Sequence, residues 1–153
     1  MYERIDAITD GLKKAGKLGE YSKITELWAK LGTRSASLEN KNIVMLGRYF
    51  KENGVETAQS YRKIAEANGF GHFSLPESTW KELESVLTEK ELWEINKKYL
   101  DIQIAQGKTF YFNIDPKDAK EGTFFYREKK HLEKYYNFSD APNASGFYYA
   151  EVK

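Results

Sequence analysis

Apolar side chains recur every three or four residues along the first half of the chain, which is the spacing of helices with one apolar face. This pattern predicts helices over residues 2–15, 20–31 and 55–68, and another amphipathic segment over residues 43–50. Asn53 and Gly54 predict a turn, and Asn68-Gly69 is a typical helix stop. Residues 1–69 are therefore expected to form a mainly helical N-terminal region.

The pattern changes near residue 70, where glycines and Pro76 bracket a short extended connector. Thr88 and Glu91 have the spacing of a capping box, which opens a helix predicted to end near Gln106. Phe110, Phe112 and Ile114 alternate with Tyr111 and Asn113, which predicts a half-buried strand over 108–115. The remaining predicted elements are a short helix over 78–87, a helix over 124–136 and a strand over 147–152. The fold class is α+β, with a helix-strand-helix-strand domain over residues 70–153.

Composition narrows the possible chemistry. The chain has no Cys and only two His, which excludes disulfides, thiolate metal sites, cysteine nucleophiles and metal sites built on several His. The net charge is +1 and neither half is polybasic, so a phosphate ligand would need a local cluster of cations. The longest apolar runs are too short for a membrane span, and the N-terminus lacks a signal-peptide pattern. If the protein is exported, the signal lies elsewhere.

The helix predicted over 124–136 carries the most informative polar pair. On a helical wheel Glu128 falls inside the apolar stripe, and His131 borders the same face one turn later. A buried carboxyl group beside a His is a common acid–base pair, because burial and a close partner shift both pKa values. The structural alternative is that Glu128 belongs to an ion pair and His131 lies on a charged surface.

Cations near this helix are candidates for phosphate contacts. Lys108 begins the predicted strand, and Arg127 precedes Glu128. Further basic residues of the helix are interleaved with tyrosines, an arrangement that can bind a phosphate backbone while the rings stack on bases. Charged helix faces are common, so this signal has low specificity. The glycines match neither a dinucleotide fingerprint nor a phosphate-binding loop.

A set of motifs in order resembles the C-terminal toxin domains of bacterial polymorphic toxins, notably the contact-dependent growth inhibition (CdiA-type) tails. The matching segments, which extend over roughly residues 43–138, are MLGRY (45–49), YRKIAEANG (61–69), GFGHFSLPESTW (69–80), LWEINKKYLDIQIAQGKTFYF (92–112), DP (115–116) and GTFFYREKKHLEKYY (122–136). The resemblance implies a small nuclease domain with an antiparallel sheet of the barnase, EndoU, colicin and RelE-like architecture, acting as a ribonuclease on tRNA.

The same resemblance implies partners and a destination. It implies a cognate immunity protein, export as part of a larger exoprotein and delivery to the cytoplasm of the target cell, and it allows a host activating protein as a further partner. The polar residues that match the motifs are Asp101, Lys108, Thr123 and Glu128. Arg127 and His131 lie on the same predicted helix but outside those motifs.

The leading hypothesis is a ribonuclease that uses neither a metal nor another cofactor. Glu128 or His131 takes the proton of the ribose 2′-hydroxyl, and the other protonates the leaving 5′-oxygen. Lys108 and Arg127 stabilise the phosphate, and Thr123 adds donors at a helix N-terminus. Two alternatives stay open. One is a metal-dependent DNase with Asp101, Asp115 and Glu128 as ligands, and the other is a non-enzymatic binding or immunity-type module.

Overall fold

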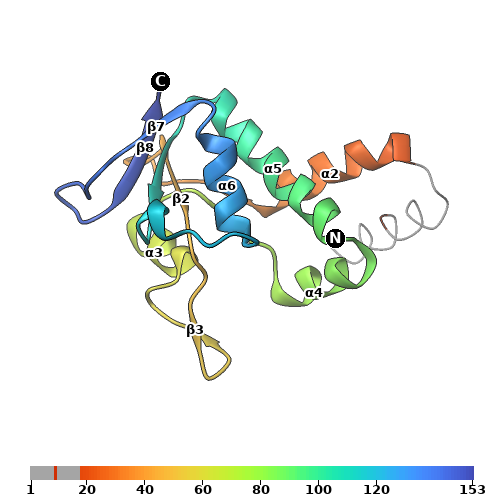
Figure 1. Cartoon of the computed structure of the whole chain (residues 1–153). Helices are drawn as coiled ribbons and strands as arrows, with labels where there is room; N and C mark the ends of the chain where they lie inside the picture. Colours follow the sequence, from red (N-terminus) through yellow and green to blue (C-terminus); the bar gives the residue numbers. More distant parts are fainter. Residues whose placement is uncertain (1–8, 10–17) are drawn as a thin grey trace. The chain divides into compact units, whose positions relative to one another are not determined.

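A computed structural model describes residue 9 and residues 18–153 of the chain (Figure 1). The helix predicted over 2–15 lies outside these residues, apart from Thr9. The described chain separates into two units. Unit 1 contains the described residues up to Thr33 together with Phe73–Leu100, and unit 2 contains Arg34–His72 together with Asp101–Lys153. Both units thus combine segments from the two sides of residue 70, which is a different grouping from the predicted division into 1–69 and 70–153.

Unit 1 is helical. It contains α2 (Leu18–Gly32), α4 (Glu77–Val86) and the first part of α5 (Glu89–Ala105). The helices predicted over 20–31 and 78–87 are therefore confirmed. The predicted capping box opens α5, since the Thr88 amide donates to Glu91 Oε1 (2.9 Å) and the Glu91 amide donates to Thr88 Oγ1 (3.2 Å). Trp28 is fully buried and donates its indole N–H to Thr9 Oγ1 at 3.0 Å.

Unit 2 is organised by a four-stranded sheet in the order β2-β6-β8-β7. Its strands are β2 (Ile43–Leu46), β6 (Thr109–Phe112), β7 (Tyr136–Phe138) and β8 (Tyr148–Val152). Strands β6, β8 and β7 pair antiparallel, as expected, whereas β2 pairs parallel to β6 with Val44 opposite Phe110. The α+β class is confirmed, and the sheet is mixed rather than wholly antiparallel.

A helix covers each face of this sheet. On one face, α3 (Tyr61–Asn68) supplies Ala65 to a cluster with Met45 and Phe70. On the other face, α6 (Phe124–Leu132) lies against β6, where the rings of Phe125 and Phe112 are 5.8 Å apart. The sheet residues Val44, Leu46, Phe110, Phe112 and Ala150 are all nearly fully buried. Unit 2 is thus a helix–sheet–helix sandwich around an aromatic core.

The shorter elements connect these layers. Strands β3 (Lys51–Glu52) and β4 (Val55–Glu56) form a hairpin, and β1 (Thr33–Arg34) pairs with β5 (His72–Phe73). The hairpin turns at Asn53 and Gly54, whose φ angles of 52° and 80° fit the type I′ turn that Asn-Gly favours. A 3-10 turn, η1 (Pro116–Asp118), follows β6. The turn predicted at Asn53-Gly54 is confirmed as the turn of a hairpin.

Three predicted elements need correction. The segment over 43–50 begins with β2 instead of a helix, because Ile43 to Leu46 is a short apolar run that suits a buried strand equally well. The helix expected over 55–68 begins only at Tyr61. The helix expected over 124–136 ends at Leu132, and Tyr136 to Phe138 join the sheet as β7. Among the described helices, none has the length and apolar character required to cross a membrane.

Candidate acid–base site

The candidate site lies on α6, and the local sequence explains how this helix forms. Thr123 is the N-cap, because its hydroxyl oxygen accepts the Tyr126 amide N–H at 3.2 Å. Phe125 and Leu132 turn one side of the helix towards the core. Glu128 and His131 share that side, and each residue is only 7% exposed. The prediction that both face the core is therefore confirmed.

The closest contact of the site joins His131 to α5. The Nε2 atom of His131 lies 2.6 Å from Oδ1 of Asp101, a residue thirty positions earlier. The Asp101 side chain is 45% exposed, so it forms the solvent-facing end of this buried pair. A carboxylate at this distance orients the imidazole ring and fixes which ring nitrogen faces α5. The pair can therefore accept and return a proton.

Glu128 acts electrostatically on α3. Burial is the main cause of a raised pKa at Tyr61, and the negative charge of Glu128 is the next largest cause. Arg62 opposes this shift, and Glu56 adds to it. The charge of Glu128 thus reaches the start of α3, where the Tyr61 hydroxyl keeps its proton at neutral pH.

The other predicted residues are engaged within unit 2. The Lys108 ammonium donates to the backbone carbonyl of Lys41. The Thr123 hydroxyl donates to the Lys120 carbonyl at 2.6 Å, in addition to capping α6. The Arg127 guanidinium carbon lies 5.7 Å from the centre of the Phe124 ring. The structure thus brings Asp101 to His131 and places Thr123, Arg127 and Glu128 along α6, whereas Lys108 has a structural contact at the start of β6.

Sequence reasoning missed the residues that hold the segment after β2. The Asn113 side chain accepts the Arg48 amide N–H (2.9 Å) and donates to the carbonyls of Arg48 (2.8 Å) and Gln59 (2.9 Å). Gly47 makes this approach possible, since its φ is 142° and an added Cβ would lie 1.9 Å from Asn113 Oδ1. The only signal in the sequence was the polar position of Asn113 at the end of a predicted strand.

The metal-ligand set considered for a DNase does not assemble. In the part of the chain that the structure describes, no group of three His, Asp or Glu side chains could hold a metal ion. Asp101, Asp115 and Glu128, the ligands of the DNase alternative, are all described and do not form such a group. Searches of protein-family models, curated proteins and solved structures find no match for this chain.

Proposed function

We propose that the protein is a ribonuclease whose acid–base groups are Glu128 and the Asp101–His131 pair. The observation that carries the proposal is the 2.6 Å contact between His131 and the half-exposed Asp101 carboxylate. Buried Glu128 lies one helical turn before His131. Two acid–base groups suit this reaction, because one proton must be taken from the 2′-hydroxyl and one given to the leaving oxygen.

The proposed reaction cleaves the RNA backbone by internal transfer. One of the two groups removes the proton of the ribose 2′-hydroxyl, whose oxygen then attacks the neighbouring phosphorus. The bond from phosphorus to the 5′-oxygen breaks, the other group protonates that oxygen, and a 2′,3′-cyclic phosphate remains. Asp101 holds the His131 ring in one orientation during the cycle. Half-buried Arg127 on the same helix supplies positive charge for the phosphate.

The biological setting is part of the same proposal. The motifs shared with the CdiA-type tails support a toxin that acts on tRNA in the cytoplasm of a competing bacterium. They also support a cognate immunity protein that covers the site, and a host activating protein as a further partner. We propose delivery as part of a larger exported protein.

The test is induced expression in bacteria, with total RNA and DNA separated on gels. We expect wild type to degrade tRNA. We expect Glu128→Gln, His131→Ala and Asp101→Asn to lower cleavage by about 100-fold or more, which is the usual contribution of a positioned acid or base. Asp140→Asn is the matched control, because it makes the same change at an exposed residue of unit 2. Circular dichroism of each variant separates lost activity from lost folding.

Purified protein then tests the mechanism. Cleavage should continue in EDTA and leave 2′,3′-cyclic phosphate ends. DNA cleavage that requires Mg²⁺ would contradict the mechanism and favour a DNase. If neither nucleic acid is degraded and the cells grow, the protein is a binding module instead of an enzyme.

A further inference from the structure

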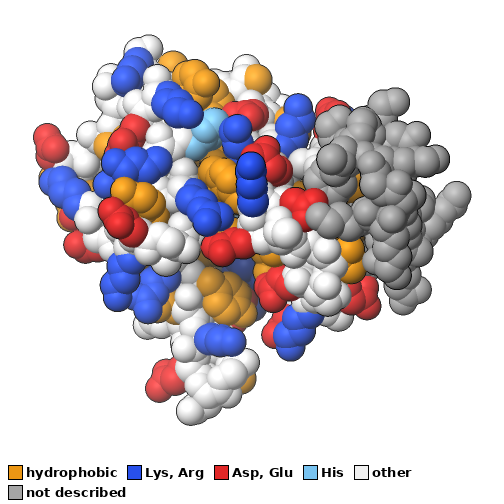
Figure 2. All heavy atoms as spheres, turned by 45° about the vertical axis from the view of Figure 1, so that its right-hand side comes forward, with side chains coloured by type: hydrophobic (Ala, Val, Ile, Leu, Met, Phe, Trp, Pro, Cys, Tyr) orange, Lys and Arg blue, Asp and Glu red, His pale blue; other side chains and the backbone are white. Residues whose placement is uncertain are grey.

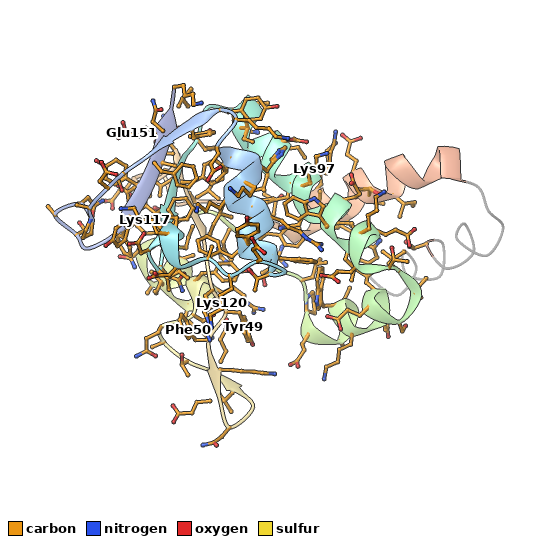
Figure 3. The ribbon with its side chains drawn as sticks, in the orientation of Figure 1. Tyr49, Phe50, Lys97, Lys117, Lys120 and Glu151 are labelled. Atoms are coloured by element: carbon orange, nitrogen blue, oxygen red, sulfur yellow. The ribbon has the colours of Figure 1, made fainter. Side chains whose placement is uncertain are left out.

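We infer that unit 2 carries a binding surface for unpaired RNA nucleotides at the base of the β3–β4 hairpin, formed by Arg48, Tyr49, Phe50 and Arg62. We call it the hairpin-base surface. The inference rests on the proposed ribonuclease function, because it names the form of RNA that the enzyme accepts. Figure 3 shows Tyr49 and Phe50 where the chain enters the hairpin. In Figure 2, hydrophobic and basic side chains are exposed together just above the hairpin.

The backbone of this surface is held rigidly. Asn113 binds both the amide and the carbonyl of Arg48, and the Tyr61 amide donates to the same carbonyl at 3.1 Å. The Thr57 amide donates to the Phe50 carbonyl at 2.8 Å. Residues 48–50 are therefore fixed by groups from the residue after β6, from the residue after β4 and from α3. A surface ordered before binding loses less entropy when a ligand arrives.

The side chains alternate positive charge with aromatic rings. The Arg48 guanidinium carbon lies 4.7 Å from the centre of the Phe50 ring, and that of Arg62 lies 5.8 Å from the centre of the Tyr49 ring. Tyr49 is nevertheless 44% exposed, so its ring can still stack on a ligand. Among the described residues, no carboxylate lies within 4 Å of the Arg48 guanidinium, whereas Arg62 has Glu56 at 3.6 Å. Arg48 is thus available to an anion.

Tyr61 borders the hairpin-base surface and is within the electrostatic influence of the proposed catalytic group Glu128. Tyr61 begins α3 next to Arg62, and its backbone is bonded to Arg48. The charge of Glu128 acts on the Tyr61 hydroxyl, and so do Arg62, Glu56 and Tyr49. A nucleotide that stacks on Tyr49 would therefore be bound on the same unit as Glu128, whose charge reaches the neighbouring Tyr61.

This chemistry fits unpaired RNA better than it fits a protein. An exposed ring stacks on any base whose face is free, and a guanidinium binds phosphate oxygens in a bidentate manner. Bases in a duplex hide their faces in the stack, so a duplex offers nothing to Tyr49. An acidic protein would use Arg48 but would gain little from the ring. A loop or end of a folded RNA supplies both the free base and the phosphate.

The experiment measures binding separately from cleavage. The probe is a short fluorescent 2′-O-methyl RNA, as a single strand and as a duplex, because it lacks the hydroxyl group that the proposed reaction requires. We expect Tyr49→Ala to weaken single-strand binding by about fivefold or more, the usual loss for one stacked base. Arg48→Gln should lower the slope of log affinity against log salt by about 0.7, the value for one phosphate contact in a single strand.

Matched controls are Val55→Ala, an exposed apolar residue of the same hairpin, and Lys63→Gln, an exposed cation of α3. Both should bind as wild type does. Unchanged affinity in Tyr49→Ala and Arg48→Gln, equal affinity for the duplex, or no binding by wild type would each overturn the surface. The first of these results would point to a protein partner at this surface. If Tyr49→Ala and Arg48→Gln weaken binding as expected but wild type cleaves no ordinary RNA, the binding surface is supported and the proposed ribonuclease activity is refuted.

Discussion

Gly47 lies where no side chain fits without movement of its neighbours. Its φ of 142° is open to glycine alone, and an added Cβ would overlap Asn113 Oδ1. We expect Gly47→Ala to lower the free energy of unfolding by about 3 kcal/mol, from backbone strain and from the lost hydrogen bonds of Asn113. Urea denaturation measures the change.

Gly122→Ala is the control for this prediction. Gly122 also has a positive φ, 87°, but an added Cβ would meet nothing within 4 Å. Its substitution should therefore cost only the local strain, about 1 kcal/mol. Equal losses in the two variants would show that the approach of Asn113 to residue 47 is unimportant for stability.

His72 makes stability depend on pH. It is buried, and burial is the main cause that lowers its pKa, with Arg62 and Arg34 adding to the shift and the Phe70 carbonyl and Glu66 opposing it. The folded protein therefore resists the protonation that the unfolded chain accepts below about pH 6.5. The contribution of neutral His72 to stability is fully present above this pH. It is lost as the pH falls towards the lowered pKa of His72 in the folded protein, by at most about 1.4 kcal/mol per pH unit.

Urea midpoints from about pH 7.5 down to about pH 5.5 test this prediction, because Asp and Glu titrate mainly below that window. His72→Gln should have a lower midpoint at neutral pH and a shallower decline than wild type. An identical decline in both proteins would assign the pH dependence to other groups.

At the scale of one helix, Thr123 decides how α6 begins. Its hydroxyl accepts the Tyr126 amide and donates to the Lys120 carbonyl, so we assign it a capping role. Thr123→Ala should lower the free energy of unfolding by about 1 kcal/mol, whereas Thr123→Asp should stay near wild type because Asp also caps helices. Thermal unfolding checks both. A stable Thr123→Asp protein that no longer cleaves RNA would instead indicate a phosphate at this helix end.

The sequence predicted the elements that depend on local signals. The capping box of Thr88 and Glu91 marked the start of α5, and alternation marked β6. Strand β2 was missed because a four-residue apolar run has no distinctive period. Strand β7 was missed, because its first residue, Tyr136, was assigned to the preceding helix and the next two residues to no element.

The sequence also predicted the part of the candidate site that depends on local periodicity. The inward position of Glu128 and His131 follows from the helical period alone. The partner of His131 does not, because Asp101 belongs to another helix and only the tertiary fold brings the two together. The hairpin-base surface was missed too, since its residues come from the segment before the hairpin and from α3.

For the whole molecule, the interleaved units predict how fragments behave. A fragment of residues 70–153 retains β6, β7, β8 and α6 but lacks β2 and α3. The edge of β6 would then lose its pairing with β2, and Tyr111 would lose its packing against the residues of β2 and α3. We expect this fragment to lack fixed tertiary structure, seen as lost near-UV circular dichroism and a broad thermal transition. Cooperative unfolding like that of the full chain would contradict the interleaved arrangement.

The parallel pairing of β2 with β6 also affects how the protein is made. The ribosome releases Ile43 to Leu46 long before Thr109 to Phe112 exist, and the helical segments of unit 1 are translated in between. The apolar residues Val44, Met45 and Leu46 therefore lack their partner strand during much of translation. We expect the nascent chain to depend on chaperones during this interval and to become protected from proteases only after β8 has emerged.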